Sequence, residues 1–406
     1  MSKNIIIIGG GAAGFFAAIA CAEGHPDYQI SILERSPNLL SKVKISGGGR
    51  CNVTHACFEP RQLVKYYPRG EKQLLGPFTR FNPTHTVDWF QSRGVKLKTE
   101  GDGRMFPVTD NSQTIIHCFL EEAKRLRINI STQLGVEELI PPNAEGSTWK
   151  VITTAGNTLL ADAVIVAAGS SARVWSMVEK VGLKIVTAVP SLFTFNIKDE
   201  RIHGLEGLSV ELATVSVVDT KLKTEGPLLI THWGMSGPAI LRLSAWGARE
   251  LAAKNHQFEI SVNWTGSQTY QQVLEDIHQV KRRHAKKLVT GNPLFNIPRR
   301  LWERLSGPIT GNKPMFNYAD LSNKQMEQLA HQIAMGRYTV NGKSTFKDEF
   351  VTAGGVDLNE IDFKTMQSKK LPGLYFAGEV LDIDAITGGF NFQAAWTTGW
   401  VAGSSV

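Results

Sequence analysis

The chain contains few cysteines and no pair of them at a metal-binding or redox spacing. Cys21, Cys51, Cys57 and Cys118 are the only four among 406 residues, and none of them forms a C-x-x-C pair. Their irregular spacing argues against a disulfide framework and against a structural zinc site. We therefore expect a protein of a reducing compartment with no metal centre.

Long apolar runs are also missing. The most hydrophobic stretch, Ile5–Ala22, is interrupted by Gly9, Gly10, Gly11 and Gly14. A membrane-spanning helix needs about 20 consecutive, predominantly apolar residues, and no segment of the chain provides them. The sequence therefore predicts a cytoplasmic protein with no membrane partner.

Acidic residues are scarce in one part of a basic chain. The formal net charge is +7, and the segment from Ser191 to Asn341 holds 18 lysines and arginines against 13 aspartates and glutamates. No acidic residue lies between Asp276 and Glu303, where seven basic residues occur. Such a cluster favours contact with phosphate groups, and the alternative is a solvated helix face. The candidate contacts for an RNA substrate are Lys281, Arg282, Arg283, Lys286 and Lys287.

A glycine-rich turn near the N-terminus carries the clearest signal. Ile5–Ile8 is typical of a buried strand, and Gly9-x-Gly11-x-x-Gly14 follows it and opens a helix. In a dinucleotide-binding turn the first glycine permits the tight bend, the second lets a pyrophosphate approach, and the third allows close helix–strand packing. Glu34, 20 residues beyond Gly14, ends the next strand and can accept hydrogen bonds from ribose hydroxyls.

The far end of the chain indicates FAD rather than NAD. The apolar strand Leu374–Ala377 ends in Gly378-Glu379, a pair that contacts the ribityl chain in two-dinucleotide flavoproteins. Thr387–Asn391 is a second glycine turn that opens a helix, and the alternative is a helix start without a ligand. No second G-x-G-x-x-G motif lies between the two ends, so NAD(P)H is expected only as a transient reductant.

The layout predicts an α/β protein: a two-dinucleotide-type Rossmann FAD domain with an inserted β domain and a small helical subdomain. Leu208–Val218 and Phe258–Val262 alternate like antiparallel strands, whereas Val273, Ile277 and Val280 have helical spacing. The length suits two or three domains. The expected ranges are 1–190 and 342–406 for the FAD domain, 191–267 and 336–341 for the β domain, and 268–335 for the helical subdomain.

Four further motifs run through the chain in order: Lys42–Asn52 (KVKISGGGRCN), Gly103–Pro107, Thr231–Pro238 and Thr365–Lys369. Together they resemble the motifs of a bacterial FAD-dependent oxidoreductase family (the YhiN/BaiN type). Its members carry names such as aminoacetone oxidase-like, bile-acid reductase-like and ribosomal RNA dihydrouridine synthase-like. The resemblance implies an FAD domain interrupted by β and helical modules. The chain departs from the family pattern in the loop Ala167–Trp175.

The motifs supply the predicted site. Arg50 suits a pyrophosphate because a guanidinium is a planar fork of donors. Cys51 is either a proton donor beside the flavin or a buried packing residue, and His232 is either a general acid or a structural histidine. Asn391 and Gln393 either bond the flavin edge or, for Asn391, cap the helix. The predicted cofactor contacts are Gly9, Gly11, Ala13, Gly14, Glu34, Arg35, Lys42, Ser46, Gly47, Gly49, Arg50, Cys51, Asn52, Ala168, Gly169, Gly378, Glu379, Gly388, Gly389, Phe390 and Asn391.

These observations favour a flavin-dependent reductase. NAD(P)H would reduce FAD, and the reduced flavin would pass hydride to an electron-poor C=C bond, with Cys51 or His232 as the acid. This choice of bond is what the family resemblance implies. Uracil in ribosomal RNA or its precursor is the leading substrate because it reconciles the resemblance with the basic insert, and a small enone is the next. An oxidase of small amines and an RNA-binding flavoprotein without catalysis are also compatible with the sequence.

Overall fold

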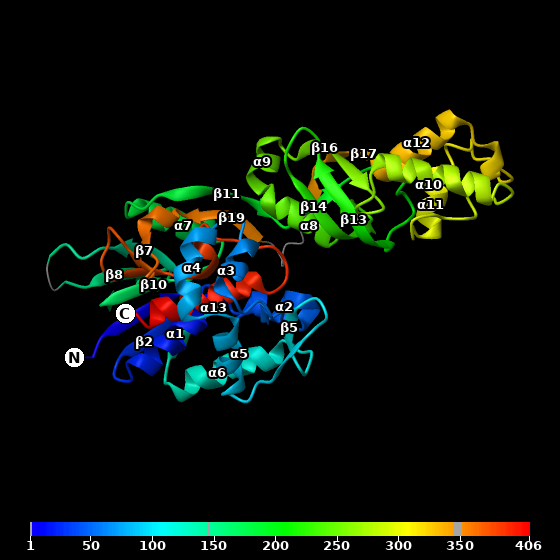
Figure 1. Cartoon of the computed structure of the whole chain (residues 1–406). Helices are drawn as coiled ribbons and strands as arrows, with labels where there is room; N and C mark the ends of the chain where they lie inside the picture. The colour runs from blue at the N-terminus through cyan, green and yellow to red at the C-terminus, as the bar shows by residue number, and fades with distance from the viewer. Residues whose placement is uncertain (1, 145–146, 345–350) are drawn as a thin grey trace. The chain divides into compact units, whose positions relative to one another are not determined.

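The computed structural model describes residues 2–144, 147–344 and 351–406 (Figure 1). They form two units, which we call the terminal unit (Met1–Val189 with Lys347–Val406) and the inserted unit (Pro190–Phe346). The insertion was expected to end at 341. It extends further because β18 (Lys343–Ser344) pairs with β12 (Thr194–Asn196) of the inserted unit.

A seven-stranded sheet forms the core of the terminal unit, in the order β20-β21-β22-β10-β1-β2-β6. Neighbouring strands from β22 to β6 are parallel, and their sequence order reverses between β1 and β10, as in a Rossmann fold. β20 (Ile361–Asp362) and β21 (Gln367–Ser368) add an antiparallel edge. The parallel strands are β1 (Asn4–Ile8), β2 (Gln29–Leu33), β6 (Asn129–Ser131), β10 (Ala163–Val166) and β22 (Leu374–Phe376).

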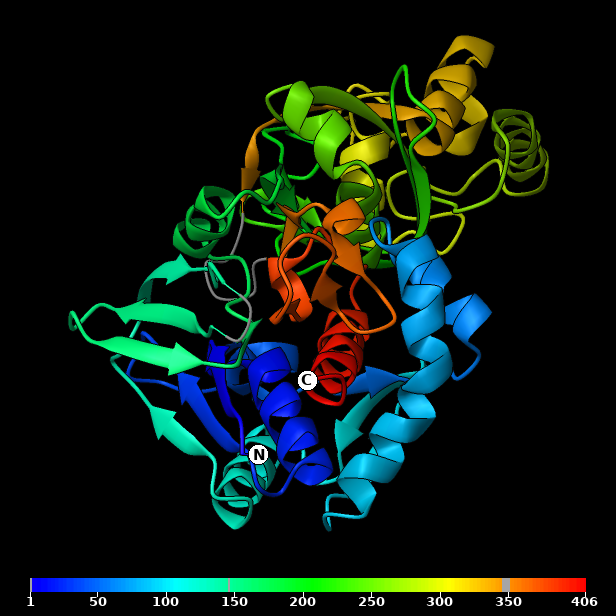
Figure 2. The same cartoon turned by 90° about the vertical axis from the view of Figure 1, so that its left-hand side faces the viewer.

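Two apolar helices pack against each other beside this sheet: α1 (Ala12–Gly24) and α13 (Phe390–Gly403) (Figure 2). They approach closely because α13 carries glycine at the contacts. A Cβ on Gly399 would lie 2.7 Å from the carbonyl oxygen of Ala13, and one on Gly403 would lie 2.1 Å from that of Ala17. Four residues separate Ala13 from Ala17 in α1 and Gly399 from Gly403 in α13, and the contacts advance along both helices together. The two helices therefore run in the same direction.

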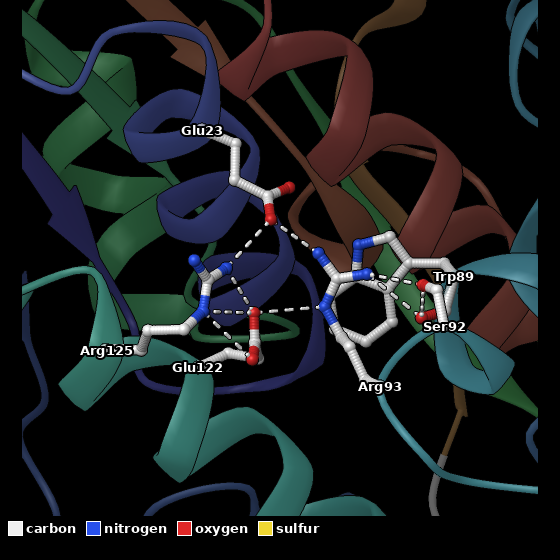
Figure 3. A network of polar contacts seen from close by, with 6 residues as sticks. All are labelled: Glu23, Trp89, Ser92, Arg93, Glu122 and Arg125. Carbon is white, nitrogen blue, oxygen red and sulfur yellow. Dashed lines mark hydrogen bonds and ion pairs between the residues drawn. The ribbon is translucent and has the colours of Figure 1, made fainter.

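A polar network ties α1 to α5 (Pro83–Gln91) and α6 (Gln113–Arg125) (Figure 3). Arg93 donates to Glu23 at 2.5 Å and to Glu122 at 3.1 Å, and its guanidinium lies 3.8 Å from the ring centroid of Trp89. Arg125 donates to Glu122 at 2.6 Å. No local sequence pattern predicts this network.

Smaller elements complete the terminal unit. Two three-stranded sheets, β3-β5-β4 and β7-β8-β9, and a pair, β11-β19, surround the main sheet. The strands are β3 (Thr54–His55), β4 (Leu97–Thr99), β5 (Arg104–Pro107), β7 (Val136–Ile140), β8 (Trp149–Thr153), β9 (Thr158–Ala161), β11 (Ile185–Ser191) and β19 (Val351–Val356). The remaining α-helices are α2 (Ser41–Gly49), α3 (Pro60–Leu63), α4 (Glu71–Arg80) and α7 (Ala172–Lys180).

The inserted unit is an antiparallel sheet with helices, in the order β17-β16-β13-β14-β15-β12-β18. Its strands and helices share one core, in which Val215 and Ile260 of the sheet belong to the same cluster as Leu301 and Met326 of the helices. The predicted β and helical modules are therefore packed together. The elements are β13 (Ser209–Val217), β14 (Lys223–Thr231), β15 (Gly234–Ser236), β16 (Gln257–Asn263), β17 (Gly336–Asn341), α8 (Pro238–Trp246), α9 (Ala248–Ala253), α10 (Tyr270–Arg283), α11 (Arg299–Ser306) and α12 (Asn323–Ala334).

None of the helices in the described ranges is long and apolar enough to cross a membrane. All four cysteines are free thiols. Within 2–144, 147–344 and 351–406, no three His, Cys, Asp or Glu side chains gather as a metal site would require.

Candidate functional site

The three glycines of the Gly9-x-Gly11-x-x-Gly14 motif, which spans the turn after β1 and the first turn of α1, differ in their surroundings. A Cβ on Gly9, whose φ is +114°, would lie 2.5 Å from the carbonyl oxygen of Ala167. A Cβ on Gly14 would lie 2.0 Å from the carbonyl oxygen of Gly9, whereas one on Gly11 would have no atom within 4 Å. Gly9 and Gly14 are thus required by packing, and only the position of Gly11 is open to an approaching ligand.

The first turn of α1 offers free backbone donors at this open position. Gly11 is the N-cap and makes no side-chain capping bond, and no acidic residue lies in the first turn. The N–H groups of a first helical turn have no partner within the helix, and the helix dipole adds a partial positive charge there. This end of the helix suits a pyrophosphate.

Glu34 is held beside the same turn at the end of β2. Its carboxylate accepts from the backbone N–H of Gly10 at 2.8 Å and from that of Ser36 at 2.7 Å. Each oxygen has a second lone pair that can accept a ribose hydroxyl. The next residue, Arg35, packs its side chain against Gly135 instead.

A second free helix N-terminus extends beyond the first. Because Gly399 lies beside Ala13, the second residue of α1, the first eight residues of α13 reach about 12 Å past the start of α1, at 1.5 Å per residue. Gly389, with φ +90°, is the N-cap of α13 and makes no side-chain capping bond. An extended dinucleotide with its pyrophosphate at α1 could reach toward this second helix start.

Glu379 lies between the carboxyl ends of β10 and β22. A Cβ on Gly169 would lie 3.9 Å from its carboxylate, which accepts from Lys42 at 2.5 Å and from the backbone N–H of Thr352 at 3.2 Å. The preceding Gly378 donates its N–H to Thr398 at 2.9 Å. The structure thus brings the predicted residues Lys42, Gly169 and Glu379 together, and it adds Thr352 and Thr398, which sequence reasoning missed.

The loop Ser46–Asn52 contacts the start of α13 through its last residue, Asn52. The amide of Asn52 accepts from the backbone N–H of Gly389 at 2.9 Å and donates to the carbonyl oxygen of Thr54 at 3.1 Å. Gly47 and Gly49 both have positive φ, which lets the loop fold back so that the N–H of Cys51 bonds the Ser46 carbonyl at 2.9 Å. The loop therefore lies against the Gly388-Gly389 turn, as a shared cofactor site would need.

Arg50 has other partners than a phosphate. Its guanidinium donates to Glu100 at 2.6 Å, lies 3.5 Å from Asp110 and stacks 4.0 Å from the ring centroid of Phe106. As placed, Arg50 fixes the loop to the small β3-β5-β4 sheet. Contact between Arg50 and the pyrophosphate stays a prediction.

The two predicted acids differ in exposure and lie in different units. Cys51 is fully buried, and this burial raises the pKa of its thiol to about 12, although a hydrogen bond with Ser46 acts in the opposite direction. Such a thiol rarely releases its proton near neutral pH, which favours the packing alternative. His232 is exposed beside Trp233, between β14 and β15.

The side chains of Asn391 and Gln393 both have hydrogen-bond partners within the protein. The predicted capping alternative for Asn391 is wrong: Gly389 is the N-cap, and Asn391 instead bonds the backbone N–H and carbonyl of Ala385. Gln393 is fully buried and accepts from Thr54 at 2.6 Å and Thr86 at 2.9 Å. Its polar atoms are thus committed to the core, because buried amides need such partners.

Two long-range features near this turn had no sequence signal. The ring of Phe390 stacks on those of Tyr66, at 4.4 Å, and His55, at 4.6 Å. The buried Asp384 pairs with Arg69, and this pair anchors the segment that leads to the Gly388-Gly389 turn. Over 300 residues separate these partners from Tyr66 and Arg69, so no local pattern reveals them.

The predicted RNA contacts divide into two groups on the inserted unit. Lys281 donates to the Leu321 carbonyl, and Arg282 pairs with Glu275 at 2.7 Å. The other three are exposed at the end of α10 and just after it, and no carboxylate among the described residues pairs with them. We call these three the α10 cations: Arg283, Lys286 and Lys287.

The residues present fit FAD. Two helix starts without caps, an open glycine at one of them, and a fixed carboxylate beside it are the donor and acceptor set that an extended dinucleotide needs. All predicted cofactor contacts lie in the terminal unit.

Comparison with known proteins agrees with this geometry. A family model described as HI0933-like protein Rossmann domain matches residues 3–405. The chain is 27% identical to the "Ribosomal RNA dihydrouridine synthase" of Escherichia coli (strain K12), over 98% of this chain and 96% of that protein. It is 29% identical to the "3-dehydro-bile acid delta(4,6)-reductase" of Clostridium scindens, over 99% and 98%.

A solved structure shares the fold at low identity. The chain matches a 3-ketosteroid-delta4-(5alpha)-dehydrogenase from Rhodococcus jostii RHA1 with a TM-score of 0.53 and 12% identity, over 100% of this chain and 96% of that one. Fold and site together define an FAD-dependent oxidoreductase. The chain belongs to the family of HI0933-like proteins with a Rossmann domain. The predicted fold class and the family resemblance are thereby confirmed.

Proposed function

We propose that this oxidoreductase reduces an activated C=C bond with NAD(P)H as a transient reductant, and that its substrate is uracil in ribosomal RNA. The observation that carries the chemistry is the pair of full-length relatives. Formation of dihydrouridine and delta(4,6)-reduction of a 3-dehydro bile acid both saturate a C=C bond conjugated with a carbonyl group. The same two half-reactions, reduction of FAD by NAD(P)H and reduction of the C=C bond by the reduced flavin, therefore serve either substrate.

The α10 cations favour RNA over a small molecule. Three exposed positive charges, which no carboxylate within 2–144, 147–344 or 351–406 pairs with, suit a phosphate backbone, and a small enone has no need of them. The second relative supports the small enone as a second candidate, at a nearly equal identity.

Bound FAD would supply hydride transfer, and the chain itself must provide the proton for the second carbon. His232 is the favoured one of the two predicted donors because its side chain is exposed, whereas Cys51 is enclosed. Replacing His232 with Asn should lower the rate of substrate reduction by about 100-fold or more without slowing flavin reduction. Cys51→Ala should leave both rates within a few fold.

The first test is anaerobic photometry of the yellow protein. NADH or NADPH should bleach the long-wavelength flavin absorbance, and RNA from cells that lack the protein should restore it. Recovery of the absorbance with a small enone but not with RNA would favour the second candidate, a small-enone reductase. A flavin that neither nucleotide bleaches would refute the proposal that the protein is a reductase. Release of peroxide with amines would then indicate an amine oxidase.

Charge reversal tests the RNA assignment separately. Arg283→Glu, Lys286→Glu and Lys287→Glu combined should abolish activity on RNA while FAD stays bound and nucleotide oxidation continues. A matched control reverses three other exposed lysines of the inserted unit, Lys254, Lys313 and Lys324. Equal activity of the two triple variants on RNA would contradict the role of the α10 cations.

A further inference from the structure

A groove of about 520 Å³ lies on the terminal unit, apart from the residues predicted to bind the cofactor. One wall is α4, and the other is the segment Leu358–Lys369, which includes η3 (Leu358–Glu360), β20 and β21. This segment contains the Thr365–Lys369 motif, to which the proposed function gives no role. The volume of the groove falls within the range of pockets for small ligands, about 300–1,000 Å³.

The groove is lined by four cations and one carboxylate: Lys72, Arg80, Lys364, Lys369 and Asp362. All four cations are exposed, and within the described ranges none of them forms a salt bridge. The single carboxylate, Asp362, turns back to accept from the backbone N–H of Lys364 at 3.0 Å. A groove with this charge excess attracts anions.

Two of the cations are held in place without being neutralised. Arg80 donates to the carbonyl oxygen of Lys364 at 2.5 Å, and Lys369 donates to that of Asn359 at 2.9 Å. Each carbonyl uses one N–H, so both side chains keep further donors for a ligand. The arrangement therefore orients positive charge and does not cancel it.

An aromatic side chain accompanies the charges. Phe363 is half-buried and lines the groove with the amides of Gln73 and Asn359. Cations beside an aromatic ring are the combination that single-stranded nucleic acids use, since phosphates contact the charges and a base stacks on the ring.

We propose that this groove binds a nucleotide unit, with its phosphate at Lys72 and Lys364 and its base against Phe363. The substrate RNA is the source we favour, and this choice of source rests on the proposed function. A free nicotinamide nucleotide has the same phosphate and planar-ring chemistry and is the other source. The groove would then be a second RNA contact, on the terminal unit, in addition to the α10 cations.

The test is equilibrium binding of a labelled single-stranded oligouridylate and, separately, of NADPH, to the FAD-loaded protein. The variant Lys72→Glu/Lys364→Glu alters two side chains with no hydrogen bond to other described residues. The control Lys150→Glu/Lys180→Glu changes the net charge equally at two exposed lysines of the same unit outside the groove. Flavin content and circular dichroism verify that each variant is folded.

The groove variant should bind the oligonucleotide at least tenfold more weakly at low salt. Its log–log salt dependence should flatten by about 0.7, since Lys72 and Lys364 contact one phosphate and each lost phosphate contact on a single strand removes about 0.7. Phe363→Ala should weaken binding severalfold without changing that slope. The control should bind as the parent does.

Each outcome has a distinct meaning. A loss for NADPH but not for the oligonucleotide keeps the nucleotide site and assigns it to the free cofactor. Equal affinity of groove and control variants for both probes would overturn the proposal. Because binding is read without turnover, failure to form dihydrouridine would refute the proposed function and leave the groove standing.

Discussion

The glycines at the start of α1 differ in what a methyl group would meet, and this difference separates ligand binding from packing. At Gly11 nothing lies within 4 Å and φ is −93°, so alanine fits the chain itself. A bound pyrophosphate would occupy that open side. We predict that Gly11→Ala leaves the stability of the apoprotein within about 0.5 kcal/mol of the parent and weakens FAD binding by tenfold or more.

The measurement is a flavin fluorescence titration of the apoprotein, combined with urea unfolding. Gly14→Ala is the contrasting variant, because its Cβ would lie 2.0 Å from the Gly9 carbonyl oxygen. It should destabilise the apoprotein by about 2 kcal/mol or more, as overpacking does. Normal FAD affinity of Gly11→Ala would show that the pyrophosphate lies elsewhere.

At the scale of elements, the network in Figure 3 makes the attachment of α6 to α1 dependent on pH. Burial acts to raise the pKa of Glu122, but hydrogen bonds and charges from Arg125 and Arg93 outweigh it, so this pKa is lowered. A lowered folded-state pKa stabilises the fold above the unfolded value of about 4.3. That contribution disappears as the pH falls through the folded-state value.

We predict that Glu122→Gln lowers the free energy of unfolding by about 1 kcal/mol at pH 7, as a partly exposed ion-pair network would. The difference from the parent should shrink as the pH is lowered from 5 to 3, because the parent carboxylate is then protonated. Urea unfolding at a series of pH values measures it. Glu121→Gln, exposed on the same helix and without an ion pair among the described residues, is the control. A deficit that is constant with pH would exclude the charge as its cause.

At the scale of the whole molecule, local patterns predicted the elements well and the side-chain partners poorly. Ile5–Ile8, Gln29–Leu33 and Leu374–Ala377 were recognisable because β-branched or apolar runs ended in glycine or an acid, and the structure has strands at all three. The spacing of Val273 and Ile277 likewise predicted α10, where both are buried. Such signals are local, so sequence alone carries them.

The rest depends on residues brought together only by folding. Arg50 looked free to bind phosphate because Glu100, its partner, lies 50 positions away. Gln393 looked available to the flavin, but Thr54, 339 positions earlier, engages it. The separate helical subdomain was inferred from a change in pattern, which gives no information on whether two modules share a core.

The division of the core leads to a prediction for thermal unfolding. All predicted FAD contacts lie in the terminal unit, whereas the inserted unit has a hydrophobic core of its own. FAD at 100 times its Kd should stabilise the unit that binds it by about 2.7 kcal/mol. For a unit of this size that corresponds to roughly 5–10 °C. Calorimetry of the apoprotein should therefore show two transitions, of which FAD raises one and leaves the other unchanged. Riboflavin lacks the pyrophosphate that we expect at α1 and should produce little shift. A single transition that FAD raises would show that the two cores unfold as one.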